Sequence, residues 1–306
     1  MNINIIKGRI ECAKKVVIYG PEGIGKSTMA SQFPQPVFID CEGSTKELDV
    51  ARYPPPRSFE DILAFMDDAV TNHTCKTLII DTADWAEHLC TRYTCRRLNV
   101  KGIEDLGYGK GYTYQSEDFQ LLLSRADMLI EHGINVVFIA HAVMRKFEQP
   151  DEMGAYDRWE LKLAKRIAPL LKEWADMVLF VNYKTAVITD TKTNSKKATG
   201  GSRVMYTAHH PCWDAKNRFG LGEELPASYD SIRHIFEASS STNAPINRLR
   251  EMMAEADISE EQLKHLVASK GHYPETTAIG EYSADFIENW AIKHFNQIVK
   301  TIKEDI

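Results

Sequence analysis

The stretch Gly20–Ser27 constrains the fold of this chain more than any other part of the sequence. It reads Gly-Pro-Glu-Gly-Ile-Gly-Lys-Ser and fits G-x-x-x-x-G-K-[ST] at every fixed position. The apolar run Val16–Tyr19 before it predicts a buried strand, and the run Ser27–Gln32 after it is compatible with a helix. A glycine-rich turn between a strand and a helix presents backbone N–H groups to an anion. The pattern therefore predicts a phosphate-binding loop; the alternative is a chance glycine turn.

This loop predicts the binding of a nucleoside triphosphate, which we expect to be ATP, together with Mg²⁺. Lys26 would reach the β- and γ-phosphates, and the Ser27 hydroxyl would ligate the Mg²⁺. The residues expected to line the nucleotide site are Gly20, Pro21, Glu22, Gly23, Ile24, Gly25, Lys26, Ser27 and Thr28.

Composition limits the class of protein. The chain has 306 residues and a net charge of −6, so any nucleic-acid site must be a local basic patch in an acidic protein. We find no apolar run long enough for a membrane span and no signal peptide. The six cysteines lack a Cys-x-x-Cys pair, which predicts a cytoplasmic protein with free thiols. A metal site that joins His209, His210 and Cys212 to Cys90 or Cys95 is an alternative without zinc-like spacing.

Short apolar segments alternate with helical stretches over the first two thirds of the chain, which predicts an α/β fold with a mainly parallel sheet. Ser58 followed by Asp61 predicts the capped start of a helix that ends at Asn72, and Lys184–Lys216 is expected to form a hairpin or loop. The expected strands are Val16–Tyr19, Val37–Asp40, Thr77–Asp81, Asn135–Ala140, Met177–Asn182 and Arg203–Ala208.

A change in composition predicts a second part of the chain. We expect an ATPase core at 1–238, a flexible linker at 239–245 and a helical module at 246–306. Amphipathic spacing predicts helices at Ile246–Ala256, Ser259–Lys270 and Asp285–Ile302, and Ser259 with Gln262 forms a capping-box pattern.

Carboxylates end two of the expected strands, where an open α/β sheet binds its ligand. Glu42 is a candidate for orienting or deprotonating the attacking water, and Asp40 competes with it; either could instead be a solvated strand-end group. Asp81 ends an apolar strand and is expected to hold the Mg²⁺. Asp84 is an alternative to Asp81, or a helix cap.

Three further residues are candidates for sensing the nucleotide. His141 ends a strand and is expected to bond the γ-phosphate, although a histidine there can also be structural. Lys216 and Arg218 lie in a polar loop and would reach the γ-phosphate of a neighbouring subunit; the alternative is a solvated basic pair.

Together these features resemble RecA-type ATPases over roughly residues 10–237, and most closely the phage-encoded RecA-like group of single-strand annealing and recombination proteins. Three strings carry the narrower resemblance: Tyr156–Leu163, Glu173–Phe180 and Ala215–Leu221. His141 stands where RecA itself has glutamine, and RecA's long N-terminal polymerisation helix is absent, so both a ring and a filament stay open.

The resemblance implies a RecA-like core, a catalytic role for Glu42, trans-acting roles for Lys216 and Arg218, and a homo-oligomer with active sites at subunit interfaces. It further implies a phage protein acting in the cytoplasm of a bacterial host. The helical module is similar to tails of phage recombination proteins, and a single-strand binding protein is its expected partner.

RecA-type proteins hold single-stranded DNA in two loops, which correspond here to Val100–Gln115 and Met144–Arg166. Both carry cations and aromatic rings, a mixture suited to sequence-neutral single-strand binding. The alternative is that Trp159, Leu161, Leu163 and Ile167 anchor a helix in the core, while the lysines and arginines of that helix face water. The expected DNA-binding residues are Lys110, Tyr112, Arg145, Lys146, Arg158, Trp159 and Lys162.

The resulting functional hypothesis is an ATP-dependent, DNA-stimulated single-strand binding protein that promotes annealing or recombination. Two alternatives remain: a ring-forming helicase or translocating motor of the same fold, and a nucleotide-switched loader for a single-strand binding protein.

Overall fold

The computed structural model describes residues 11–148, 154–189, 196–256 and 258–304, with side chains described throughout except at 185–200, 238–244, 284 and 304. The chain divides into two compact units, Met1–Arg233 and His234–Ile306.

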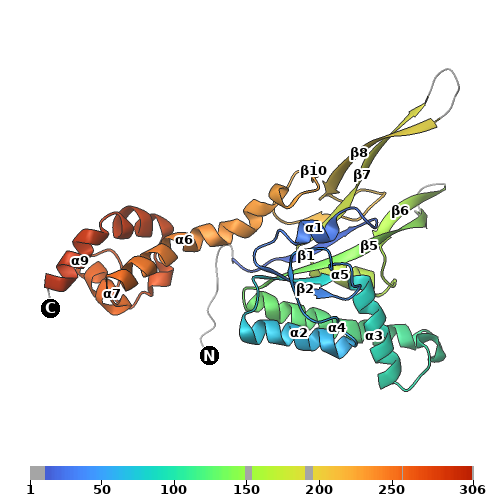
Figure 1. Ribbon diagram of the computed structural model, residues 1–306, viewed down its shortest axis with the longest axis horizontal. Helices are drawn as coiled ribbons and strands as arrows, with labels where there is room; N and C mark the ends of the chain where they lie inside the picture. The colour runs from blue at the N-terminus through green and yellow to red at the C-terminus, as the bar shows by residue number, and fades with distance from the viewer. Residues whose placement is uncertain (1–10, 149–153, 190–195, 257, 305–306) are drawn as a thin grey trace. The chain divides into compact units, whose positions relative to one another are not determined.

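The first unit is built of alternating strands and helices (Figure 1). Its strands are β1 (Lys15–Gly20), β2 (Pro36–Asp40), β3 (Ala51–Arg52), β4 (Thr77–Asp81), β5 (Asn135–Glu148), β6 (Ala155–Leu161), β7 (Met177–Thr189), β8 (Lys196–Tyr206), β9 (Lys216–Asn217) and β10 (Glu224–Pro226). Its helices are α1 (Lys26–Ala30), α2 (Phe59–Asn72), α3 (Ala83–Arg97), α4 (Lys110–Glu131) and α5 (Ile167–Trp174), with 3₁₀ turns η1 (Ile103–Asp105) and η2 (Tyr229–Ser231).

The strands form one sheet in the order β10-β8-β7-β1-β5-β4-β2-β3. β1, β5, β4, β2 and β3 run parallel to their neighbours, as β7 does to β1. The register places Gly20 opposite His141 and Asp40 opposite Asp81. The carboxyl ends of β1, β2 and β4 therefore meet β5 at His141 along one edge of the sheet, which is where the sequence predicts a ligand site.

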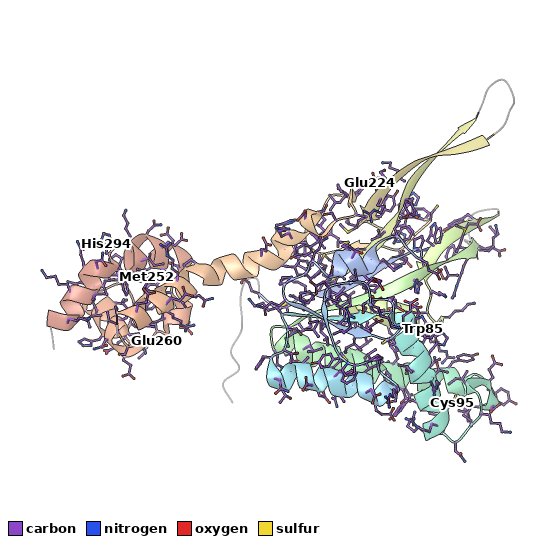
Figure 2. All side chains as sticks on the ribbon, in the orientation of Figure 1. Trp85, Cys95, Glu224, Met252, Glu260 and His294 are labelled. Carbon is purple, nitrogen blue, oxygen red and sulfur yellow. The ribbon has the colours of Figure 1, made fainter. Side chains whose placement is uncertain are left out.

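The central strands are apolar because both of their faces are covered. Val16, Val17 and Ile18 have no exposed surface. Helices α2, α3 and α4 gather on one side of the sheet (Figure 1), and their side chains and those of α5 share a core with the strands (Figure 2). The predicted α/β fold with a mainly parallel sheet is confirmed.

Two strands extend further than the sequence predicts. β5 continues past His141 to Glu148 and pairs with the antiparallel β6, and β7 continues to Thr189 and pairs with the antiparallel β8. The second hairpin lies in the segment expected as a hairpin or loop, whose residues 190–195 fall outside the described ranges. Beyond Val143, the residues of β5 alternate between exposed and half-buried positions, so this extension lacks the continuous apolar run that marks a core strand.

α2 shows why the local sequence signals succeed. The Ser58 hydroxyl accepts a 3.1 Å bond from the Asp61 N–H, and the Asp61 carboxylate accepts a 3.2 Å bond from the Ser58 N–H. This reciprocal capping box satisfies two donors at the start of the helix. The predicted helix and its cap are confirmed.

The second unit is helical. Its elements are α6 (Arg233–Glu255), which begins at the last residue of the first unit, α7 (Glu260–Ser269), η3 (Ile279–Glu281), α8 (Ala284–Phe286), the π-helix η4 (Ile287–Ile292) and α9 (Phe295–Glu304). Ser259 and Gln262 form the expected capping box. The second unit has its own apolar core, in which Leu249, Leu263 and Ile279 have no exposed surface.

The flexible linker expected at 239–245 is replaced by helix, because α6 runs through these residues and carries Pro245. Serine, threonine and asparagine disfavour a helix by less than about 1 kcal/mol each, so composition alone does not end it. Among the described residues, no helix is both long and apolar enough to cross a bilayer.

Candidate functional site

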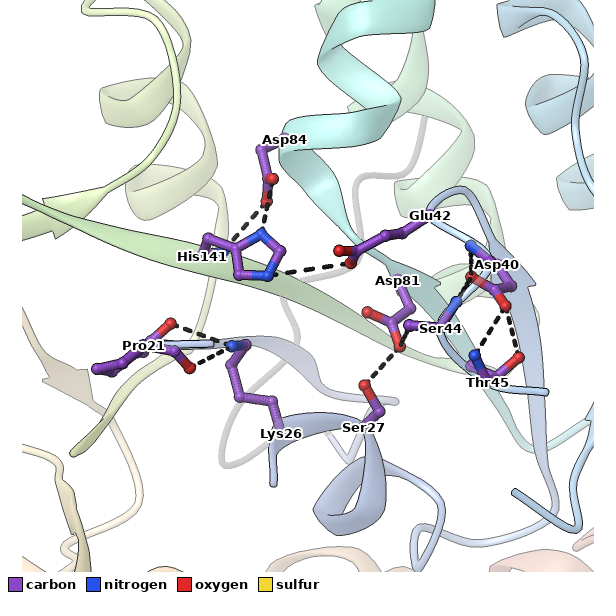
Figure 3. A network of polar contacts seen from close by, with 12 residues as sticks. Pro21, Lys26, Ser27, Asp40, Glu42, Ser44, Thr45, Asp81, Asp84 and His141 are labelled. Atoms are coloured by element: carbon purple, nitrogen blue, oxygen red, sulfur yellow. Dashed lines mark hydrogen bonds and ion pairs between the residues drawn. The ribbon is translucent and has the colours of Figure 1, made fainter. Parts of the chain in front are cut away.

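The phosphate loop connects β1 to α1, and its own lysine forms hydrogen bonds with the backbone of the loop (Figure 3). Gly23 and Gly25 have φ of +69° and +99°, which L side chains rarely adopt. The Lys26 ammonium donates to the carbonyl oxygens of Gly20 at 3.1 Å and Pro21 at 2.8 Å. Burial lowers the pKa of Lys26, although nearby carboxylates oppose this. An incoming phosphate would replace these two carbonyls as the partner of the ammonium.

The Ser27 hydroxyl donates a 2.6 Å hydrogen bond to Oδ2 of Asp81, as expected for two groups that share a cation (Figure 3). Asp81 is 1% exposed, and burial raises its pKa to about 6. Its other oxygen, Oδ1, is buried and has no hydrogen-bond partner among the described residues. A buried carboxylate oxygen without a donor, next to a hydroxyl, fits Mg²⁺ or one of its waters. Ser27 and Asp81 would therefore hold the Mg²⁺, as the sequence predicts.

Asp40 and Glu42 have different surroundings, although Asp40 ends β2 and Glu42 lies only two residues after it. The Asp40 carboxylate accepts bonds from the N–H groups of Gly43 at 2.7 Å and Thr45 at 3.0 Å, and from the Thr45 hydroxyl at 2.6 Å. Burial opposes its ionisation, but these bonds keep the pKa of Asp40 below its usual value. Asp40 thus builds the turn after β2. The action of Glu42 on the attacking water stays a prediction.

His141 lies between two carboxylates. Its Nδ1 is 2.8 Å from Oδ2 of Asp84, and its Nε2 is 3.9 Å from Oε2 of Glu42 (Figure 3). The Asp84 carboxylate also accepts the backbone N–H of His141 at 3.1 Å. The bond to Asp84 raises the pKa of His141. Burial would raise the pKa of Asp84, yet the bonds from His141 outweigh burial and lower it.

Asp84 therefore does neither of the tasks the sequence assigned to it. The N-cap of α3 is Thr82, and Asp84 lies in the first turn with its carboxylate on His141 rather than on the Ser27–Asp81 pair. Sequence spacing could not show this contact, since the two residues are 57 positions apart.

Lys216 and Arg218 lie near the amino-terminal end of β7, whereas the phosphate loop of the same chain follows the carboxyl-terminal end of β1. β9 pairs with the first residues of β7, where Val178 faces Lys216. The Lys216 ammonium donates to the carbonyl oxygens of Glu173 at 3.1 Å and Ala175 at 2.5 Å, and Arg218 binds Asp176 at 2.8 Å. Both cations thus support the end of α5 within one chain, and their action on a neighbour's nucleotide stays a prediction.

The first expected DNA segment is only partly a loop. α4 begins at Lys110, so Lys110 and Tyr112 lie in its first turn, where the Tyr112 hydroxyl bonds Glu104 at 2.7 Å. Tyr108, just before the helix, is fully exposed. Gly109, at φ +70°, is the N-cap of α4. The glycine-rich composition of this segment is typical of a mobile loop and did not reveal that role.

The second expected DNA segment is the β5–β6 hairpin, continued by the turn into α5, rather than a loop or a core helix; residues 149–153 lie outside the described ranges. Lys146 pairs with Asp157 at 2.9 Å, and Arg145 lies 3.8 Å from Glu160. Arg158 forms an ion pair with Asp214.

Trp159 and Lys162 differ within this segment. Trp159 packs against the core through Phe180 at 6.0 Å between ring centroids, so the alternative of a core anchor holds for this residue. Lys162 is exposed, and its backbone N–H donates to the His141 carbonyl at 2.9 Å.

The structure also brings Arg203 to the phosphate loop, which sequence reasoning missed. Its Nη1 lies 3.4 Å from the carbonyl oxygen of Ile24. The contact spans 179 positions and depends on the β7–β8 register, so no local signal could have found it.

The alternative metal site is not supported. In the described residues, no group of three or more His, Cys, Asp or Glu side chains is placed to hold a metal ion. Mg²⁺ in a phosphate-loop site needs no such group, because nucleotide oxygens and water supply most of its ligands.

Comparison with known proteins places this site in a family. The AAA domain family AAA_24 matches residues 13–219, about two thirds of the chain. The SPbeta prophage-derived uncharacterized protein YorG of Bacillus subtilis (strain 168) is 26% identical over 177 residues, which are 55% of this chain and 50% of YorG. The chain thus spans about half the length of that relative. The KaiC-like protein PH0186 of Pyrococcus horikoshii OT3 aligns at a TM-score of 0.34 and 14% identity, over 63% of this chain and 77% of that one.

The family match covers the phosphate loop, the Ser27–Asp81 pair and the His141 cluster. The chain belongs to the AAA domain family, and its phosphate loop lies within the matched residues.

Proposed function

We propose that this chain is a phage-type ATPase that hydrolyses Mg²⁺-ATP in response to single-stranded DNA during annealing or recombination. The observation that carries the proposal is the continuity of β5, which holds His141 at the nucleotide edge and then runs into the basic and aromatic β5–β6 hairpin. DNA binding at the hairpin and nucleotide binding at His141 would thus both contact the same β-strand. The prophage-derived name of one relative supports a phage origin.

Each residue of the site has a separate role in the proposed hydrolysis. Lys26 holds the β- and γ-phosphates, and Glu42 orients the attacking water and accepts its proton. Asp84 fixes the ring of His141, so that Nε2 points toward Glu42 and the place of the γ-phosphate. Mg²⁺ held by Ser27 and Asp81 would neutralise charge on the phosphate oxygens.

DNA would reach this site through the hairpin cations. Lys146 and Arg145 have carboxylate neighbours, which backbone phosphates of DNA would displace as partners. Lys162 joins the hairpin to His141 through its backbone N–H, so a shift of the hairpin on DNA moves the strand end that carries the histidine. Exposed aromatic residues such as Tyr108 would stack on bases without sequence preference.

The test compares ATP turnover with and without a single-stranded oligonucleotide at low salt. We expect stimulation in the wild type and reduced stimulation in the double variant Lys146→Ala, Lys162→Ala. Stimulation should be unchanged in Lys76→Ala, which removes an exposed lysine just before β4. A chain that neither binds DNA at low salt nor responds to it would refute the DNA-linked function while leaving ATP hydrolysis intact. A strand-displacement assay on forked DNA separates this function from a translocating motor, because annealing needs no unwinding.

A further inference from the structure

Arg203 places a guanidinium against the phosphate loop. Its strand, β8, pairs with β7, and β7 lies beside β1, so the hairpin brings Arg203 to the loop from the same chain. Nη1 of Arg203 lies 3.4 Å from the Ile24 carbonyl oxygen. It also lies 2.7 Å from the point where a Cβ of Gly25 would stand, so the glycine leaves the space that the guanidinium enters.

In the part of the chain that the structure describes, this cation has no carboxylate partner. Within the described residues, Arg203 makes no ion pair, and its one side-chain hydrogen bond is the long one to Ile24. Lys184 lies on the same hairpin, one position from the residue that faces Arg203, and forms a 2.5 Å ion pair with Glu224. An exposed arginine beside an anion-binding loop, with most of its five donors unused, is arranged to bind an anion.

We propose that Arg203 binds the α- or β-phosphate of the nucleotide in cis, as a further residue of the binding site. The loop backbone cradles the α- and β-phosphates, whereas Lys26 reaches on to the γ-phosphate. Arg203 touches the loop at Ile24–Gly25, on the side before Lys26, so its contact is shared by ATP and ADP. The planar guanidinium offers two parallel donors to one phosphate, which suits a group common to both nucleotides. The assignment rests on the proposed nucleotide-binding function.

The test is calorimetric binding of Mg²⁺-ADP and of a non-hydrolysable Mg²⁺-ATP analogue to the full chain. We expect Arg203→Ala to weaken both about 10- to 100-fold, the effect of one lost charge-assisted contact. Arg203→Lys keeps the charge and should recover part of the affinity. Lys184→Ala removes a cation of the same hairpin and should bind both nucleotides as the wild type does.

A purely structural role for Arg203 gives a different result. Arg203→Gln keeps an N–H donor for the Ile24 carbonyl without the charge, so a structural contact would survive in it and a phosphate contact would not. Wild-type affinity in Arg203→Gln or Arg203→Ala, or weakening confined to the ATP analogue, would overturn the assignment. A wild-type chain that binds neither nucleotide would instead overturn the proposed function itself. Unfolding temperatures of the ligand-free variants show whether each remains folded.

Discussion

The carboxylate of Asp84 accepts two hydrogen bonds from His141, one from the backbone N–H at 3.1 Å and one from Nδ1 at 2.8 Å. An ionised carboxylate only accepts, so Nδ1 carries a proton and Nε2 is the ring atom that meets Glu42 and the γ-phosphate. Asp84 thus sets both the tautomer and the direction of the histidine.

Replacing Asp84 should change the pH at which His141 titrates. The pKa of His141 is raised by Asp84, so Asp84→Asn should move it to lower pH. We expect ATP turnover to fall about 10- to 100-fold, the effect of losing a hydrogen bond to a charged group. NMR titration of the His141 ring and the pH profile of kcat/KM measure the two effects. His141→Gln is the control, because it removes the titration; an unshifted ring in Asp84→Asn would contradict the role given to Asp84.

The buried carboxyl of Asp81 should make Mg²⁺-nucleotide affinity depend on pH. Its pKa of about 6 lies above the ordinary value, so below pH 6 the ligand-free protein carries a proton that the cation must displace. Affinity should therefore rise about tenfold per pH unit up to about pH 6 and then level off. Binding of Mg²⁺-ADP is measured from pH 5 to about 7.5. Asp81→Asn shows the titration of the nucleotide alone, and equal pH profiles for the two proteins would refute this account.

The capping box of α2 should contribute measurably to stability. Ser58→Ala removes the acceptor of the Asp61 N–H and should lower the free energy of unfolding by about 1 kcal/mol. Ser58→Asp keeps an acceptor and should cost much less. Urea unfolding of the two variants checks this, and equal midpoints for Ser58→Ala and the wild type would show that the cap has no energetic weight.

The sequence could predict those parts of the site that lie in one β-strand or directly after it. The phosphate loop, the strand ending at Asp81 and the turn after β2 are local, and parallel pairing brings strand ends to one edge whatever the details. The choice between Asp40 and Glu42 needed the turn that binds Asp40, and the Asp84–His141 bond needed the direction of α3. Arg203 could not be predicted, because a shift of one residue in the hairpin would turn its side chain to the other face.

Lys216 and Arg218 could act on the nucleotide of a neighbouring subunit or only stabilise the end of α5 in their own chain. Mixing two variants separates these two roles. Lys26→Ala should lose about 100-fold or more in turnover but retain both cations, and Arg218→Ala should retain a complete phosphate loop. If subunits share sites, a mixture of the two inactive variants should recover part of the wild-type rate. The rate of the mixture is compared with the mean of the separate variants; a mixture no faster than that mean would exclude a shared site.

Glu42→Gln tests the central claim most directly, with Asp40→Asn as its matched control. ATP binding and ATP turnover are measured on the same preparation of each variant. We predict that Glu42→Gln binds Mg²⁺-ATP as the wild type does and hydrolyses it about 100-fold or more slowly, because the group that activates water is gone. Asp40→Asn should mainly lower the unfolding temperature. Wild-type turnover in Glu42→Gln would contradict the assignment of this edge of the sheet as the hydrolytic site.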